Sequence, residues 1–111
     1  MKLTSWNIRG LGSKRKQRML SNRMKQETLN IMFIQEMKCS IQKVRQIHSK
    51  WLSCYEFLEV KAENTVGGIL TLWNPRKIGI LDAEASKNYL SVVIQPVRER
   101  DTYLVTNVYG P

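Results

Sequence analysis

The sequence predicts an α+β fold (α/β by a looser convention) in which one β-sheet packs on another. Short apolar runs alternate with two stretches of helical periodicity in the first half of the chain, and the second half is a series of strands separated by turns. A strand–helix–strand order predicts parallel strands, whereas strands joined by short turns predict an antiparallel meander. The runs LSVVI and TYLVT are apolar at nearly every position, which is typical of strands buried on both faces.

The first predicted strand covers residues 2–8 and is broken by Gly10. Ser13 then has the side chain of an N-cap, and the following apolar residues recur four apart, so we predict a helix over 14–28. This order places a strand end, a glycine turn and a helix start close together in the chain.

The apolar run IMFIQ at 31–35 predicts a second, buried strand of ordinary length. Apolar residues three and four apart over 40–52 predict an amphipathic helix. That helix contains the only histidine of the chain, His48. Because it lies between core-facing positions, we expect it to be structural, although histidine serves chemistry wherever a fold supplies partners.

The strands of the second half are bounded by turn formers, among them Pro75 in NPRK and the polar loop RERD. Gly67 and Gly68 predict a bulge or a close backbone approach at the beginning of one strand. The strands are expected over 55–60, 66–73, 78–83, 89–97 and 102–109.

The chain has 111 residues, which suits a single domain over 1–111, and a formal net charge of +9. Such an excess favours polyanionic partners, either nucleic acid or acidic lipid. No apolar run reaches the roughly 18 residues that a membrane span needs, and the beginning lacks the pattern of a signal peptide. We therefore expect a nuclear or cytoplasmic protein, neither secreted nor membrane-spanning, with Cys39 and Cys54 as reduced thiols.

The basic residues are densest at the beginning of the first predicted helix. This basic cluster consists of Lys14, Arg15, Lys16 and Arg18. The helix dipole is already positive there, so each cation costs about 0.3–1 kcal/mol at low salt. A bound phosphate would offset the repulsion. The alternative is a solvated basic face whose repulsion is screened by salt.

Three predicted strands end in polar side chains that can serve chemistry, namely Asn7, Glu36 and Tyr109. Strand ends hold such side chains rigidly while the neighbouring loops leave room for a ligand. Glu36 directly follows a buried apolar run, and a carboxylate in this place suits a hard cation such as Mg²⁺. The alternative is a surface glutamate that begins a loop.

Four segments occur in order along the chain: SWNIRG at 5–10, IQEMK at 34–38, GGILTLW at 67–73 and NVYGP at 107–111. Together they resemble the endonuclease/exonuclease/phosphatase family over the whole chain. Their amino-acid sequences are most similar to the endonuclease domain of plant-type non-LTR (LINE-like) retrotransposons. That domain is itself related to the apurinic/apyrimidinic endonucleases. The resemblance implies a four-layer sandwich of two packed, mainly antiparallel sheets with helices outside.

The resemblance also implies roles for individual residues. Asn7 would help to hold the reacting phosphate, and Glu36 would bind the catalytic divalent ion, Mg²⁺ or Mn²⁺. The Tyr109 hydroxyl would form a hydrogen bond near the scissile phosphate. Lys38 would support the site, while Arg9 and the basic cluster would lie along the DNA backbone.

The sequence departs from the family pattern in several places. Many apurinic-type relatives have Asp or Asn where this chain has Arg9, which we interpret as subgroup character. Met37 replaces a common threonine, which we interpret as a milder change. The family's Asp-x-Asn (GDFN) and Ser-Asp-His motifs are absent. The resemblance thus implies the truncated, N-terminal half of a Mg-dependent DNA endonuclease, with weak metal binding and little or no activity alone.

We expect such a half-sandwich to expose apolar strand faces and therefore to self-associate. Two other functions stay open from the sequence. One is a non-catalytic basic module that binds nucleic acid, and the other, less favoured, is a relative of the lipid or inositol phosphoesterases.

Overall fold

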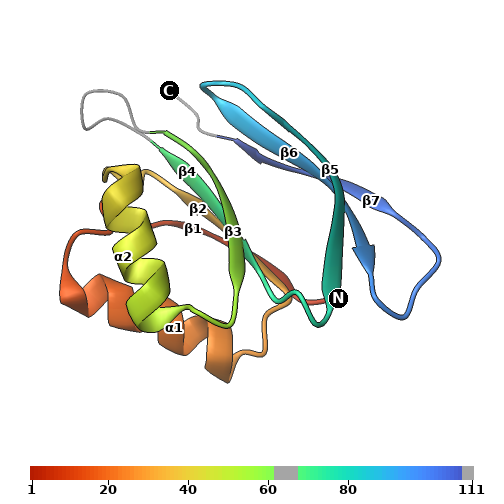
Figure 1. Cartoon of the computed structure of the whole chain (residues 1–111), viewed down its shortest axis with the longest axis horizontal. Helices are drawn as coiled ribbons and strands as arrows, with labels where there is room; N and C mark the ends of the chain where they lie inside the picture. Colours follow the sequence, from red (N-terminus) through yellow and green to blue (C-terminus); the bar gives the residue numbers. More distant parts are fainter. Residues whose placement is uncertain (62–67, 109–111) are drawn as a thin grey trace.

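The computed structural model describes residues 1–61 and 68–108, in which two sheets pack face to face (Figure 1). Both helices cover the outer face of one sheet, and the other sheet has no helix on it in the described ranges. The predicted class, α+β with packed sheets, is confirmed. The elements are β1 (Leu3–Asn7), α1 (Lys14–Gln26), β2 (Ile31–Gln35), α2 (Ile41–Trp51), β3 (Glu56–Val60), β4 (Ile69–Trp73), β5 (Ile78–Ala85), β6 (Tyr89–Pro96) and β7 (Tyr103–Val108).

The first sheet has the strand order β1-β2-β4-β3. β1 and β2 are parallel, as the strand–helix–strand order predicted. β4 is antiparallel to both β2 and β3 and lies between them. The meander expected for the second half is therefore interrupted, and only β5, β6 and β7 form a continuous antiparallel meander, as the second sheet.

Two apolar cores explain why β2 and β4 are apolar at almost every position. In β2, Met32 and Ile34 pack beneath the helices, whereas Ile31 and Phe33 pack against the second sheet. β4 divides its side chains between the same two cores. A strand between two packed layers has no solvent face, so both sets of alternating positions must be apolar.

The expectation that LSVVI and TYLVT are buried on both faces is wrong. In β6, buried Leu90, Val92 and Ile94 alternate with half-buried outer residues. In β7, Leu104 is 71% exposed and Val108 is 56% exposed. No element of the described ranges covers the outer face of this sheet (Figure 1), so an apolar sequence here forms exposed surface.

Local signals in the sequence fix the helix that follows β1. The predicted cap is confirmed, since Ser13 Oγ accepts the backbone N–H of Lys16 at 3.2 Å. α1 ends at Gln26, slightly before the predicted end. His48 of α2 donates from Nε2 to the carbonyl oxygen of Tyr55, at 2.6 Å, which agrees with a structural role. Neither helix of the described chain is long and apolar enough to cross a membrane.

Glu59 on β3 has one buried carboxylate oxygen, Oε2, that lacks a hydrogen-bond partner among the described residues. Burial raises the pKa of this carboxyl, while Arg45 and Lys61 oppose the shift. At low pH the group is neutral in both the folded and the unfolded chain. As pH rises through the raised folded-state pKa, the folded chain must ionise a partly buried group, so stability is lost.

We expect Glu59→Gln to raise the free energy of unfolding at pH 7 by about 0.5–1 kcal/mol, because the amide keeps the size and removes the charge. The difference between variant and parent should vanish near pH 4. Urea unfolding followed by tryptophan fluorescence at both pH values measures it. A variant less stable than the parent at pH 7 would mean that attraction to Arg45 and Lys61 outweighs the burial.

Candidate functional site

The ends of β1 and β2 bring two of the predicted polar residues to one edge of the first sheet. Asn7 is the last residue of β1 and lies opposite Gln35, the last residue of β2. Glu36 follows directly, so these side chains start from neighbouring strands. Asn7 is exposed and Glu36 is half-buried, which leaves both accessible to a ligand.

Backbone hydrogen bonds continue beyond the strands and fix the loops of this edge. The Gly10 N–H donates to the Glu36 carbonyl at 2.7 Å, and the Leu11 N–H donates to the Met37 carbonyl at 2.9 Å. The Met37 N–H in turn donates to the Gly68 carbonyl at 3.1 Å. Because Met37 is fully buried, Glu36 precedes a residue that the core holds in place.

Several residues of these loops adopt left-handed backbone conformations. The φ angle is 52° at Arg9, 54° at Glu36 and 48° at Lys38, a region that costs a non-glycine residue about 1–3 kcal/mol. Gly10 has φ of 101° and adopts it without a Cβ clash. In the described chain, the other non-glycine residue with positive φ is Thr28. Such strain gathers at functional sites, where the surrounding contacts enforce it.

Lys16 joins the start of α1 to the loop that leaves β1. Its ammonium donates to the carbonyl oxygens of Ile8 at 2.8 Å and Arg9 at 2.9 Å. These oxygens compensate part of the repulsion that a cation meets at a helix start. The resemblance implies that Lys16 lies along DNA with the rest of the basic cluster, which stays a prediction. In the structure its ammonium makes this internal contact. The other members of the cluster are exposed.

A buried amide ties the same loop to α2. Gln17, 5% exposed, donates to the Leu11 carbonyl at 3.1 Å, and its oxygen accepts the indole N–H of Trp51 at 3.2 Å. The Arg18 guanidinium lies over the Trp51 ring, 5.9 Å from its centroid, as in a cation–π pair. The basic cluster is therefore carried by a helix that is anchored on two sides.

A buried polar network behind the site joins the two sheets. Asn107 on β7 is 1% exposed, and its amide nitrogen donates to the Leu70 carbonyl at 3.1 Å. Gln35 Nε2 donates to Asn107 Oδ1 at 2.8 Å and to Ser5 Oγ at 3.0 Å. The network fixes the side chain of the residue that precedes Glu36.

The interpretation of the sequence missed Asn107, although a signal was present. Side chains of β7 alternate between the two faces of the sheet, and Asn107 falls on the same face as half-buried Val105. A carboxamide on a core-facing position needs internal partners, because an unpaired buried amide is costly. From the motif NVYGP, only the tyrosine was predicted to be a site residue.

Two of the predicted features involve residues outside the described ranges. Tyr109 lies there, so its place beside Asn7 and Glu36 stays a prediction. Gly67 also lies there. The bulge or close backbone approach predicted for this glycine pair stays a prediction; Gly68 has φ of 89°, and its carbonyl accepts the hydrogen bond from the Met37 N–H.

The donor atoms at this edge fit one part of a magnesium site. Glu36 offers a carboxylate and Asn7 a carboxamide oxygen, both of which are ligands that Mg²⁺ takes in proteins. No group of three or more His, Cys, Asp or Glu side chains that could hold a metal occurs among the described residues. Because Mg²⁺ keeps several waters and binds through one or two carboxylates, Glu36 suits one ligand of a weak site.

We expect Mn²⁺, a paramagnetic substitute for Mg²⁺ at oxygen sites, to broaden the amide NMR signals around Glu36 first. Glu36→Gln should raise the Mn²⁺ concentration needed for this broadening at least fivefold, because it removes the carboxylate. Glu56→Gln, which changes an exposed carboxylate at the start of β3, is the matched control. Equal broadening in the parent and in Glu36→Gln would exclude this residue as a metal ligand.

No protein-family model matches the sequence, and no curated protein matches it. Solved structures of the endonuclease/exonuclease/phosphatase fold do match, which confirms the resemblance at the level of the fold. The catalytic domain of Xenopus laevis APE2 has a TM-score of 0.74 and 18% identity, over 100% of this chain and 45% of that one.

Two further structures share this fold. D. rerio TDP2 in complex with a single-strand DNA product has a TM-score of 0.67 and 18% identity, over 96% of this chain and 45% of that one. An endonuclease/exonuclease/phosphatase family protein of Bacteroides thetaiotaomicron has a TM-score of 0.70 and 10% identity, over 92% and 48%. The chain thus spans about half the length of the solved structures that it matches.

Proposed function

We propose that residues 1–111 form the N-terminal half of a metal-dependent DNA endonuclease domain of retrotransposon type. The observation that carries the proposal is the edge where Asn7 ends β1 and Glu36 directly follows the neighbouring strand β2, next to loops with left-handed backbone conformations. The single-strand DNA product bound to TDP2, a protein of the same fold, supports a nucleic-acid substrate. The retrotransposon assignment rests on the amino-acid sequences of the four segments.

Each residue of this edge has a separate task in the proposal. Asn7 donates a hydrogen bond to a phosphate oxygen, Glu36 holds the divalent ion, and Lys38 adds positive charge beside it. When bound, the ion stabilises negative charge on the phosphate. Arg9 and the exposed members of the basic cluster bind the neighbouring backbone phosphates, and Tyr109 positions the scissile phosphate.

We propose further that this half-site binds DNA without cleaving it. Hydrolysis of a phosphodiester needs groups that activate water and that protonate the leaving oxygen. Among the described residues, Glu36 does not belong to any group of three or more His, Cys, Asp or Glu side chains that could hold a metal.

The test is a DNA-binding and plasmid-nicking assay with matched charge variants. We expect Arg15→Ala/Arg18→Ala to weaken binding at least tenfold at low salt and to reduce the slope of log K against log salt by about 1.8. Lys87→Ala/Arg100→Ala removes the same charge from exposed turns of the second sheet and should change binding little. Equal losses in both double variants would contradict a defined DNA path along α1.

The nicking arm uses supercoiled plasmid and Mg²⁺ with the parent chain and Glu36→Ala. We expect no nicking by either protein. Mg²⁺-dependent nicking that disappears in Glu36→Ala would overturn the proposed inactivity while it supported the endonuclease assignment.

A second candidate is a nucleic-acid-binding module with no catalytic role, which the composition of α1 favours. Its sequence KRKQRMLSNRMKQ carries cations along its length and no carboxylate. DNA affinity in the presence of Mg²⁺ separates the two candidates. Unchanged affinity in Asn7→Ala and Glu36→Gln supports the module, whereas weaker binding in both supports the half-site.

We also propose that the outer face of the second sheet mediates self-association. Leu104 and Val108 are exposed on the edge strand β7, which leaves backbone groups open to another strand. Sedimentation velocity should show an average mass that rises with concentration, and Leu104→Lys should reduce this rise. A monomer at every concentration would refute the proposal.

A further inference from the structure

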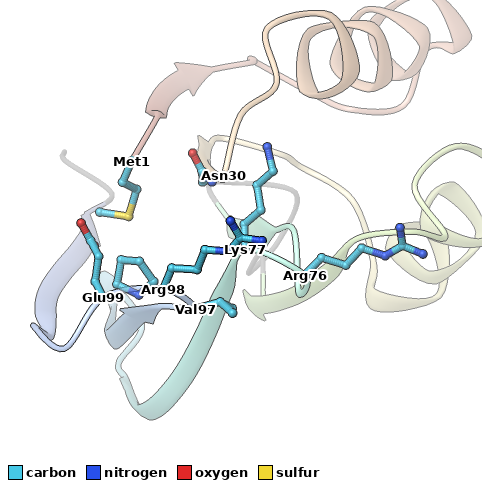
Figure 2. Close-up of a pocket in the computed structure, with 8 residues that line it drawn as sticks. Met1, Asn30, Arg76, Lys77, Val97, Arg98 and Glu99 are labelled. Atoms are coloured by element: carbon cyan, nitrogen blue, oxygen red, sulfur yellow. The ribbon is translucent and has the colours of Figure 1, made fainter.

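A pocket of about 490 Å³ opens at the end of the sandwich opposite Asn7 and Glu36 (Figure 2). Its walls come from the beginning of the chain, the residue before β2, the turn between β4 and β5, and the turn after β6. β1 and β2 are each 5 residues long, so at about 3.3 Å per residue the pocket lies roughly 15 Å from the candidate site.

Backbone hydrogen bonds join the walls of this pocket to one another. The Asn74 N–H donates to the Asn30 carbonyl at 2.9 Å, and the Val97 N–H donates to the Lys77 carbonyl at 2.9 Å. The Lys2 N–H donates to Asn30 Oδ1 at 2.6 Å. A pocket whose walls are already fixed loses little entropy when it binds a ligand.

Cations dominate the charged lining of the pocket. Three lining residues are basic, namely Arg76, Lys77 and Arg98, and one is acidic, Glu99. Figure 2 shows Arg98 extending across the pocket toward Lys77, whose side chain rises at the edge of the pocket on the side of Asn30, while Arg76 points away from it. Within the described part of the chain, no ion pair joins these cations to a carboxylate. Two like charges held in one pocket repel each other, and a bound anion would remove that repulsion.

Apolar surface lies next to the two cations. Met1 is 53% exposed and Val97 is 60% exposed, and both line the same pocket. A bare phosphate would use the cations alone, whereas a phosphate that carries a flat organic group would also cover the apolar wall. The volume falls within the range of roughly 300–1,000 Å³ that is typical of small-molecule sites.

We propose that this pocket binds the phosphoryl group of a nucleotide, either free or at the end of a nucleic-acid strand. The phosphate lies between Lys77 and Arg98, where an ammonium and a guanidinium give charge-assisted hydrogen bonds. The nucleoside covers Met1 and Val97. This site is separate from the edge of Asn7 and Glu36, and it stands whether or not the proposed endonuclease function is correct.

The test is a titration of the ¹⁵N-labelled full chain with adenosine monophosphate, followed by amide NMR. We expect saturable shifts at residues 76–78 and 97–99, and weaker shifts of the same signals with inorganic phosphate. Lys77→Ala and Arg98→Ala should each weaken binding at least fivefold. Arg100→Ala, an exposed cation of the same turn outside the pocket, should leave binding unchanged.

Glu99→Gln provides a variant whose expected effect is a gain. Removal of the one pocket carboxylate should tighten nucleotide binding at least twofold, a result that partial unfolding cannot produce. Asn7→Ala should leave the titration unchanged, because that residue lies at the other end of the strands. Shifts confined to the Asn7 edge, or an equal loss in Arg100→Ala and Lys77→Ala, would overturn the proposal.

A pair of dinucleotides distinguishes the two sources of the phosphate. If a 5′-phosphorylated dinucleotide binds as tightly as the mononucleotide and the unphosphorylated one does not, the pocket accepts a strand end. If the mononucleotide alone binds, the pocket takes free nucleotides. Tight binding of plain adenosine to the same residues would overturn the role assigned to Lys77 and Arg98.

Discussion

Asn107→Ala is expected to lower the free energy of unfolding by about 2–4 kcal/mol, a large share of the 5–15 kcal/mol typical of a small domain. Its amide nitrogen donates to the carbonyls of Leu70 and Ile34, at 3.1 Å and 3.4 Å, and its oxygen accepts from Gln35 at 2.8 Å. Alanine removes these hydrogen bonds from the interface between the sheets, where a polar group that loses a partner is costly, although Gln35 keeps its bond to Ser5.

Urea unfolding of the parent and the variant measures this loss. Asn88→Ala is the matched control, because Asn88 is an exposed residue of the turn between β5 and β6, where we expect a change within about 0.5 kcal/mol. A loss below about 1 kcal/mol for Asn107→Ala would mean that water replaces the amide in its network.

The same substitution should also disturb the candidate site. Gln35 would keep Ser5 as its partner but lose Asn107, so the residue before Glu36 would gain freedom. We expect the broadening by Mn²⁺ around Glu36 to need more metal in Asn107→Ala, even in the fraction that stays folded. The network thus links the stability of the sandwich to the geometry of its edge.

The local elements could be predicted from the sequence because their signals lie within a few residues of each other. The side chain of Ser13 begins a helix wherever an amphipathic stretch follows, and the run IMFIQ can only be a buried element. The place of β4 between β2 and β3 could not be predicted. Strand order depends on contacts between distant segments, and an apolar run does not specify its neighbour.

The exposed face of β7 could not be predicted for a related reason. TYLVT has the composition of a buried strand, but burial depends on what packs against it, and no described element covers Leu104. An apolar residue in a strand indicates a β-conformation more reliably than it indicates burial.

The position of Asn7 and Glu36 at the same end of the first sheet could be predicted because the parallel strands that precede them end there. The left-handed conformations of Arg9, Glu36 and Lys38 could not be predicted, since they occur in loops that hydrogen bonds between segments distant in the sequence hold together. The contact of Lys16 with the carbonyls of Ile8 and Arg9 could not be predicted from the sequence for the same reason. From sequence alone, a lysine in a basic run is predicted to be solvent-exposed, and its contacts with carbonyl oxygens become known only from the fold.

Leu11→Ala is the other substitution with a large expected effect, a loss of about 2–5 kcal/mol in the free energy of unfolding. Leu11 lies between two glycines in a segment that reads as a loop, yet its side chain is 0% exposed and belongs to the core beneath the helices. Alanine would leave a cavity there. The backbone bond from the Leu11 N–H to the Met37 carbonyl, at 2.9 Å, needs no side chain, so the variant isolates the effect of packing.

Leu104→Ala removes the same atoms from an exposed position and should change the free energy of unfolding by less than about 1 kcal/mol. Hydrogen exchange of the Leu11 amide gives a second measurement. If packing of this side chain anchors the loop, the amide exchanges only through global unfolding in the parent and through local opening in Leu11→Ala. Exchange by local opening in the parent would show that the loop of Arg9 and Gly10 opens independently of the core, and its left-handed conformations would then need another cause.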